Sequence, residues 1–395
     1  MKSNDARCRN HLGRTRALTI VMVACLAVIE LPTRAAQPAV ALRARAMIDI
    51  ERDRLIENAT VVVAGTRIVA AGPSSEIAVP SGATVVQLPD VTLLPGLIDA
   101  HVHLTLAGQP SANARATLSA GFTTVQDLGA AAYTNVALRD AIAAGRIDGP
   151  RVVASGPWLG ISGGTCDFNG IGVRGAEAFR ARVRQDVEHG VDLIKVCVTG
   201  WLADAVEQPS KYEISDGELA AAVDEAHRLG KRVAVHALSS GGITVAVRLG
   251  ADLVAHAGFP SPETVATMKA RGIRQLPTLF SLSTGNPEHL SALRTHMRSA
   301  AAAGLPIAFG TDAGVIPHGD NAREFEHLAS IGLEAPAALR AATLSAAAAV
   351  GLAGEVGVLA PGRLADVIGV NGNPLQDVRA LQHVSFVMKD GKVYR

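Results

Sequence analysis

Two histidines one residue apart, His101 and His103, lie at the end of an apolar run at residues 94–104. A run of this composition predicts a short buried β-strand, in which residues two apart point to the same face. The two imidazoles would therefore converge at the carboxyl end of that strand. Neutral imidazole nitrogens are common ligands of transition metals, so the pair predicts a metal site, provided that further ligands follow.

Four more residues that can bind metals lie at or near the ends of other apolar runs along the chain. They are Lys195, His236, His256 and Asp312. Any one of them could be a satisfied polar group of the core, although a buried lysine is costly unless it is paired or neutral. Six such residues on the ends of five predicted strands favour one shared functional site over six separate core groups.

Between residues 95 and 356, predicted strands and helices alternate eight times, which indicates parallel βα units. The strands are expected at residues 97–104, 122–128, 151–155, 192–199, 232–238, 252–257, 273–279 and 306–312. Two helix starts carry capping signals, Ser215 with Glu218 and Ser261 with Pro262. This pattern is typical of an α/β protein with a closed (β/α)8 barrel of TIM type, whose active site lies at the carboxyl ends of the strands.

Short β-branched runs separated by glycines lie at both ends of the chain. They occupy residues 60–63, 67–70 and 84–88, then 366–370, 384–388 and 392–394. The first set predicts a small antiparallel sheet, and Asp390-Gly391 is a hairpin signal between the last two runs. We therefore expect a small composite β-sandwich of residues 37–94 and 357–395, with the barrel of residues 95–356 between its two parts.

Residues 1–36 predict a secretory signal peptide, because basic residues precede an apolar run at residues 17–29 that is too short to span a membrane. Lipidation at Cys25 and a start codon placed too far upstream are the alternatives. We expect a periplasmic or secreted protein, and a cytoplasmic one if the leader is not real. The mature chain would keep only Cys166 and Cys197, too few for a disulfide scaffold, and Cys197 is expected to be a buried thiol.

The overall composition is that of a globular chain with a large core. Of its 395 residues, 48% are hydrophobic and 18% are charged, and the net charge is +1. Neither a basic face nor interleaved basic and aromatic residues are present, so no nucleic-acid partner is expected. We expect a small-molecule substrate and no membrane span once the leader is removed. The oligomeric state is left open, including a homo-oligomer.

The six-residue set resembles the binuclear pattern of the amidohydrolase superfamily, in which His-x-His opens a (β/α)8 barrel. This resemblance covers nearly the whole chain after the leader. It implies two divalent metal ions, one bound by His101, His103 and Asp312, the second by His236 and His256, and both bridged by Lys195. The lysine would be N6-carboxylated by carbon dioxide, since burial lowers the pKa of a lysine and leaves a free amine. Zinc is the first expectation for this mixed ligand set.

The motif Phe309-Gly310-Thr311-Asp312-Ala313-Gly314 and the turn at residues 361–366 resemble the imidazolonepropionase-related and prolidase-like branch of that superfamily. The resemblance implies cleavage of an amide C–N bond by a metal-bridging hydroxide, with Asp312 moving its proton to the leaving amine. A dipeptide or an N-acyl amino acid is the expected substrate. Its carboxylate would meet donors among Lys211, Tyr212, His318 and Asn321, and support of the loop after the eighth strand by hydrogen bonds is an equal alternative role for His318 and Asn321. Trp201 and Tyr212 are candidate substrate walls, and Thr165 stands where many relatives have His.

Other functions fit the same residues. An esterase, lactonase or phosphotriesterase would use the same metal pair. A non-catalytic metal-binding or scaffolding relative is the alternative from another class, against which the presence of both Asp312 and Lys195 argues. A mononuclear deaminase of the superfamily carries His-x-x-Glu on the fifth strand, but Ser239 takes the place of that Glu after His236.

Overall fold

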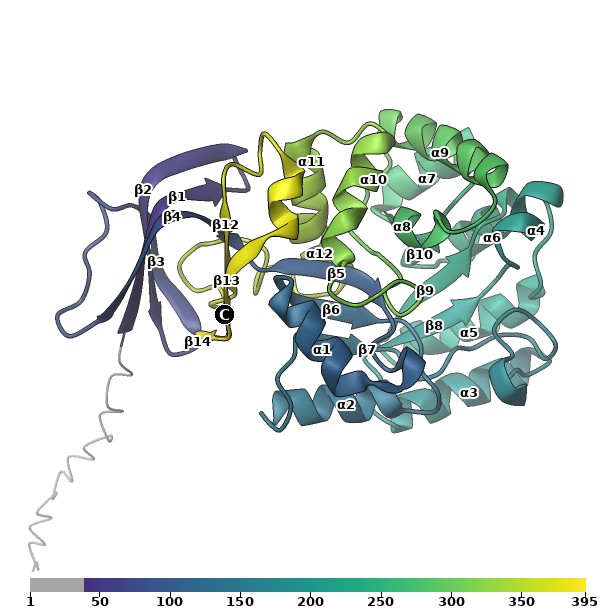
Figure 1. The fold of residues 1–395 in the computed structure, drawn as a ribbon. Helices are drawn as coiled ribbons and strands as arrows, with labels where there is room; N and C mark the ends of the chain where they lie inside the picture. The colour runs from purple at the N-terminus through teal and green to yellow at the C-terminus, as the bar shows by residue number, and fades with distance from the viewer. Residues whose placement is uncertain (1–38) are drawn as a thin grey trace, which may run out of the picture. The chain divides into compact units, whose positions relative to one another are not determined.

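The computed structural model describes residues 39–395, so the predicted signal peptide lies outside the described residues. Two kinds of β-structure are present, a mixed sheet of strands from both termini and a ring of parallel strands surrounded by helices (Figure 1). None of the helices in the described part of the chain combines the length and apolar character of a membrane-spanning segment.

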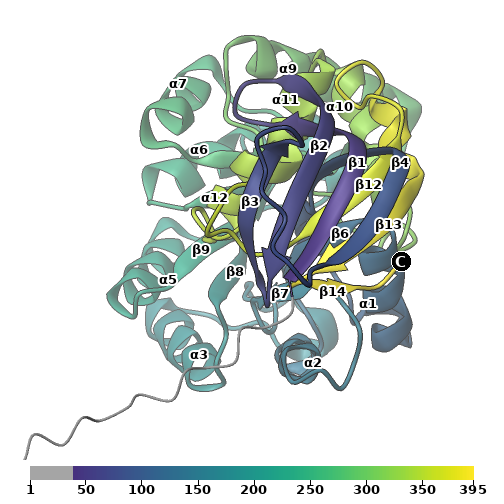
Figure 2. The same ribbon diagram turned by 90° about the vertical axis from the view of Figure 1, so that its left-hand side faces the viewer.

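A seven-stranded sheet combines strands from the two ends of the chain (Figure 2). In spatial order, the strands are β14 (Lys392–Val393), β13 (Val384–Lys389), β12 (Val367–Asn371), β4 (Thr84–Pro95), β1 (Ala39–Asp49), β2 (Arg54–Ala64) and β3 (Arg67–Pro73). The C-terminal β12 pairs antiparallel with the N-terminal β4, with Gly369 opposite Leu93. The prediction of a composite β-structure from both ends is therefore confirmed.

Strand β1 differs from the sequence prediction in two respects. It was not among the predicted strands, because alanine and arginine outnumber β-branched residues in it. It pairs antiparallel with β2 but parallel with β4, so the expectation of a purely antiparallel N-terminal sheet was wrong. The predicted hairpin turn is confirmed, since Asp390 and Gly391 join β13 to β14 with φ values of 49° and 76°.

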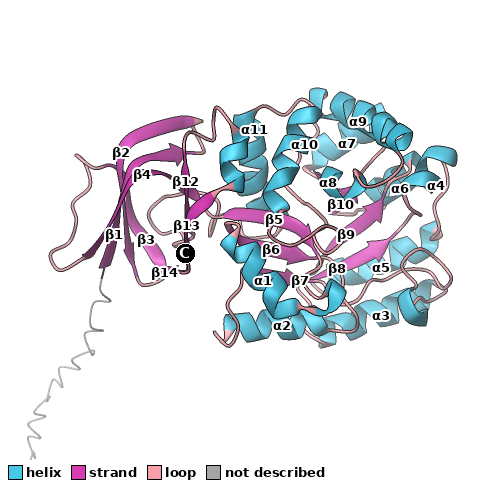
Figure 3. Ribbon diagram, viewed as in Figure 1, coloured by secondary structure: helices cyan, strands magenta, loops and turns pink. Residues whose placement is uncertain are grey.

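Seven parallel strands and one extended segment form the barrel, and helices surround them (Figure 3). The strands are β5 (Leu97–Val102), β6 (Phe122–Asp127), β7 (Arg151–Ala154), β8 (Leu193–Cys197), β9 (Arg232–Ala237), β10 (Leu253–His256) and β11 (Arg274–Leu276). Nearly all their residues are buried, because helices cover the outside and side chains fill the interior. A parallel bridge between Leu159 and Val196 connects the group β5–β7 to the group β8–β11.

The eighth predicted strand, residues 306–312, is an extended segment without a regular ladder. A parallel bridge joins Ile307 to Gln275, and the N–H of Ala100 donates to the carbonyl of Phe309. Regular pairing does not extend along the segment, because the N–H of Phe309 donates to the carbonyl of Ala341 outside the barrel strands, and Asp312 has a φ of 61°. The segment nevertheless fills the place of a strand between β11 and β5.

The helices follow the barrel strands and cover their outer side (Figure 3). They are α1 (Pro110–Ser119), α2 (Thr134–Ala143), α3 (Ala176–Glu188), α4 (Leu202–Glu207), α5 (Asp216–Arg228), α6 (Ser240–Arg248), α7 (Pro262–Arg271), α8 (Leu279–Leu282), α9 (Pro287–Ala302), α10 (Glu324–Ser330), α11 (Ala335–Arg340) and α12 (Ala346–Ala349). Both predicted caps are confirmed, since Ser215 accepts from the N–H of Glu218, and Ser261 from that of Thr264.

The junction between β4 and β5 fixes where the first barrel strand begins. At Gly96, an added Cβ would lie 2.1 Å from the hydroxyl oxygen of Thr123, so only glycine fits there. The N–H of Gly96 donates to the carbonyl of Asp366 at 2.9 Å, and Arg151 donates to the carboxylate of Asp366 at 2.6 Å. These contacts tie the start of the barrel to the C-terminal strands.

Candidate metal centre

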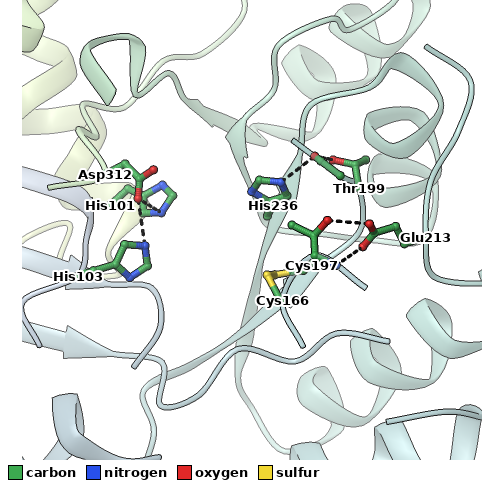
Figure 4. Close-up of a disulfide and its surroundings, with 10 residues drawn as sticks. His101, His103, Cys166, Cys197, Thr199, Glu213, His236 and Asp312 are labelled. Carbon is green, nitrogen blue, oxygen red and sulfur yellow. Dashed lines mark hydrogen bonds and ion pairs between the residues drawn. A yellow bond between two sulfur atoms is a disulfide. The ribbon is translucent and has the colours of Figure 1, made fainter. Parts of the chain in front are cut away.

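Three of the six predicted ligands form a tight group at the carboxyl end of β5 (Figure 4). The Nε2 atoms of His103 and His101 lie 3.0 Å and 3.4 Å from the same oxygen, Oδ1 of Asp312. Asp312 reaches them because its N–H donates to the carbonyl of His101 at 2.7 Å. The candidate ligand atoms of the group lie within 4.8 Å of one another, close enough to share one cation.

The other three predicted ligands face the same cavity from neighbouring strands. Lys195, His236 and His256 lie at or near the ends of β8, β9 and β10, and all three line the cavity together with the first group. The ring centroids of His236 and His256 are 4.6 Å apart, and those of His101 and His256 are 5.3 Å apart. The structure therefore brings all six residues to one place.

Lys195 is buried without a polar partner. Its side-chain nitrogen has no hydrogen-bond acceptor among residues 39–395, and the residue is only 2% exposed. Burial lowers the pKa of Lys195 to about 7, although the charge of Asp312 opposes the shift. Much of this amine would be neutral near pH 7, and a neutral amine is the form that can be carboxylated.

Burial also changes the pKa values of the four histidines. It lowers the pKa of His101 and His256 well below the usual value, and that of His236 to about 4. Burial opposes protonation of His103 too, but its hydrogen bond to Asp312 and the charge of that carboxylate outweigh burial and raise the pKa of His103. Three of the four imidazoles are thus held neutral, the form that binds metals.

Contacts on the far ring nitrogens orient three of these histidines. His103 donates from Nδ1 to the carbonyl of Gly129 at 3.0 Å, and His236 donates from Nε2 to the carbonyl of Gly200 at 3.1 Å. In His256, Nδ1 lies 2.6 Å from the hydroxyl oxygen of Thr278. The donation from His236 leaves its Nδ1 with a lone pair for a metal, whereas Nε2 of His103 faces the carboxylate of Asp312 at 3.0 Å.

Thr278 holds its hydroxyl near His256 through an unusual backbone conformation. Its φ is 52°, rare for a β-branched residue. The N–H of Thr278 donates to the carbonyl of Gly310 at 3.0 Å, and the next two N–H groups donate to the buried carboxylate of Glu324 at 2.9 Å and 2.6 Å. The φ values of His256 and Asp312, 66° and 61°, are also positive. No sequence pattern marks Thr278 or Glu324 for this supporting role.

Asn321, a predicted substrate contact, belongs to a hydrogen-bonded group that supports the turn at Asp312. It is fully buried and donates to Oδ2 of Asp99 at 2.8 Å. The same oxygen accepts from the hydroxyl of Thr311 at 2.6 Å, one residue before Asp312. Asn321 and Asp99 therefore help to fix the turn that carries the carboxylate.

Two more of the predicted substrate contacts, His318 and Tyr212, also have partners within the chain. His318 has Nε2 3.2 Å from the carbonyl oxygen of His103 and Nδ1 3.0 Å from the hydroxyl oxygen of Thr117. The hydroxyl of Tyr212 donates to Asp216 at 2.9 Å. None of the four predicted donors, Lys211, Tyr212, His318 and Asn321, is among the residues that line the cavity. A contact between these side chains and a substrate stays a prediction.

A cavity of about 420 Å³ lies in front of the six residues. Its other walls are mainly apolar and are formed by Thr105, Leu106, Ala131, Trp158, Cys166, Phe168, Cys197, Trp201 and Val315. Trp201, a candidate substrate wall from the sequence, lies at this cavity. A cavity of this size with a few convergent polar groups is typical of a small-molecule site.

Cys166 and Cys197 form a disulfide in the cavity wall (Figure 4). The prediction that Cys197 is a buried thiol was therefore wrong. The two residues are 31 positions apart in sequence, but the loop after β7 folds back along β8 and brings their Cα atoms to 6.1 Å. Since Cys197 lies two residues after Lys195, the disulfide ties this loop to the strand that carries the lysine.

A parallel barrel whose strand ends supply histidines and a carboxylate to one buried place is the architecture of metal-dependent hydrolases. Comparison with known proteins agrees with this class. The model of the Amidohydrolase family matches residues 92–394, and the chain belongs to this family. The predicted superfamily and barrel fold are confirmed.

Three individual proteins of known name are similar to this chain over most of its length. Ochratoxinase of Aspergillus niger is 30% identical over 367 residues, which cover 77% of this chain and 75% of that protein. The structure of a Xaa-Pro dipeptidase with bound methionine in the active site has a TM-score of 0.84 and 29% identity, over 90% of this chain and all of that chain. A prolidase complexed with N-methylphosphonate-L-proline has a TM-score of 0.79 and 28% identity, over 90% and 99% of the two chains. The chain is thus a hydrolase of the Amidohydrolase family, and its structural neighbours include prolidases, as the sequence resemblance predicted.

Proposed function

We propose that this chain is a binuclear metal-dependent amidohydrolase that cleaves the amide bond of a small substrate, such as an N-acyl amino acid or a dipeptide. The observation that carries the proposal is the convergence of six metal-capable side chains on one cavity, with the amine of Lys195 buried among them without a partner. A separate core role for each side chain would not bring them together in this way.

The donor set fits two divalent cations. His101, His103 and Asp312 would hold one cation, and His236 and His256 would hold the other. Lys195 would bind both cations after N6-carboxylation. The neutral amine of Lys195 would attack carbon dioxide, form a C–N bond and release one proton, which leaves a carbamate with two oxygens. Zinc suits this mixture of nitrogen and oxygen donors.

Bound cations of this kind would supply an activated water near neutral pH and polarise the substrate carbonyl. The chain's own contribution is proton transfer and positioning. The carboxylate of Asp312, 3.0 Å from Nε2 of His103, can accept the proton of the attacking water and return it to the leaving amine. The N–H and the hydroxyl of Thr311, the residue before Asp312, both donate hydrogen bonds to the carboxylate of Asp99, and these bonds hold the Asp312 turn in place.

The decisive test is the substitution Lys195→Ala. It should remove most of the bound metal and nearly all amide turnover, because the bridging ligand is lost, and short carboxylic acids such as propionate should restore part of both. Metal content is measured by elemental analysis and turnover on a panel of dipeptides, N-acyl amino acids, lactones and phosphotriesters. Lys269→Ala, an exposed lysine on α7, is the matched control.

Two outcomes would contradict this proposal. Wild-type metal content and turnover in the Lys195→Ala protein would show that the lysine only fills the core. If wild-type turnover of lactones or phosphotriesters exceeded every amide by orders of magnitude, the site would still be a hydrolase site, but amide cleavage would not be its function.

We also propose that the protein is exported to the periplasm or the medium. The leader pattern of residues 1–36 supports this location. The disulfide between Cys166 and Cys197 is a second, independent support, because disulfides persist in oxidising compartments and are rare in the cytosol.

A further inference from the structure

The mouth of the cavity gathers apolar side chains that are otherwise scarce on the surface. Seven large hydrophobic residues are exposed in the described part of the chain. Four of them, Leu106, Phe168, Trp201 and Val315, line this one cavity. The other three lie on the terminal sheet, at Val69, Val85 and Val393. A cluster of exposed apolar groups around a concave site is typical of a surface that a ligand covers.

Aromatic rings stand on both sides of the candidate metal centre. The chain has only two tryptophans, and both line the cavity. Trp158 has its ring centroid 5.6 Å from that of His103 and 4.9 Å from that of Phe168. Trp201 has its ring 5.4 Å from that of His236, which belongs to the second predicted ligand group. An aromatic substrate group could therefore pack against rings close to the reacting centre.

Contacts within the chain position Trp158 and the loop that carries Phe168. Trp158 packs against Gly129, where an added Cβ would lie 2.0 Å from the indole nitrogen. Phe168 lies on the loop that the disulfide from Cys166 ties to β8. One residue before that cysteine, Thr165 donates from its hydroxyl and its N–H to Glu213 at 2.6 Å and 2.8 Å. A loop that is already fixed costs less ordering free energy when a ligand binds.

The cavity offers no fixed cation for a substrate carboxylate. No arginine is among its lining residues in the described chain, and the one lysine there, Lys195, is 2% exposed and belongs to the candidate metal centre. A carboxylate that entered this space would lose hydration without gaining an ion pair from a side chain. An uncharged group would not incur that cost.

We infer that the substrate of this site is an amide with a bulky apolar group, above all an aromatic ring, and that it needs no free carboxylate. The ring would lie among Trp158, Phe168 and Trp201. This inference rests on the proposed amidohydrolase function and deepens it, because it names the substrate group that sets specificity.

The test uses the metal-loaded full chain and matched amides. N-acetyl-L-phenylalanine and N-acetylphenethylamine differ only by the carboxylate, and N-acetyl-L-alanine keeps the carboxylate but lacks the ring. N-benzoylglycine and N-methylbenzamide repeat the comparison with the ring on the acyl side. Within the pair that the enzyme prefers, we expect kcat/KM values within about 5-fold of each other, and a value about 100-fold lower without the ring.

Two variants locate the effect in the chain. Trp201→Ala and Phe168→Ala should each raise KM for the preferred aromatic amide about 10-fold, because each removes a packed ring. Val69→Ala, which truncates a side chain 48% exposed on β3, is the matched control and should leave KM unchanged. A readout independent of turnover is the fluorescence of Trp158 and Trp201 during titration of metal-free protein with the carboxylate-free aromatic amide, which should change and saturate.

The outcomes separate the inference from the proposed function. If N-acetyl-L-alanine or the carboxylate-bearing aromatic amides were hydrolysed far better than the carboxylate-free ones, the inference would fail while amide hydrolysis stood. Wild-type KM values in both aromatic variants would also overturn it. If the metal-loaded protein hydrolysed no amide at all, the proposed function itself would be wrong.

Discussion

Loss of the disulfide between Cys166 and Cys197 should weaken both the fold and the substrate site. The bond closes a loop across 31 sequence positions, and the chain-entropy relation gives about 3.7 kcal/mol of unfolding free energy for such a loop. Typical domains are stable by only about 5–15 kcal/mol, so this contribution is a large share of the total. Because Phe168 lies on the tied loop, reduction should also raise KM for aromatic amides more than it lowers kcat.

The assay is urea unfolding followed by circular dichroism, with and without a phosphine reductant. Reduction should lower the free energy of unfolding of the wild type by about 3–4 kcal/mol. The double variant Cys166→Ala/Cys197→Ala should start from the lower value and be insensitive to the reductant. It keeps Cys8 and Cys25, so it also controls for thiol chemistry in the leader.

A count of reactive thiols tests the presence of the disulfide directly. The full-length chain contains four cysteines, and two of them should stay unreactive in denatured, unreduced protein. Four reactive thiols in that protein, or a urea midpoint that reduction does not shift, would refute the structural role assigned to this bond.

Two further predictions concern the second predicted cation and the leader. Thr278→Val removes the hydroxyl next to Nδ1 of His256 and should weaken metal affinity about 10-fold to 100-fold, measured by competition with a chromophoric chelator. Thr295→Val, at an exposed position on α9, is the control. Wild-type metal affinity in the Thr278→Val protein would show that the hydroxyl of Thr278 does not support metal binding. Protein exported by its native host should begin after about Ala35, and an intact Met1 in mass spectrometry of that material would argue against cleavage.

Local sequence was sufficient to select the six residues of the candidate site. His101 and His103 are two apart on a buried strand, and Lys195 and His236 lie at or near the ends of apolar runs of strand length. A parallel barrel places the carboxyl ends of all its strands on one face. Residues selected from each strand separately therefore lie close together in the folded chain. The helix caps and the Asp390-Gly391 turn were predictable for the same reason, because each depends on residues only a few positions apart.

Long-range contacts could not be predicted in this way. The parallel pairing of β1 with β4, the disulfide across 31 positions and the hydroxyl of Thr278 beside His256 each depend on how a loop returns to a distant strand. Asn321 also shows this limit, since its place in the chain left substrate contact and support of the loop equally open, and its hydrogen bond to Asp99 is seen only in the fold. Periodicity reports which face of an element is buried, but the partner that covers that face is chosen by packing among all the elements at once.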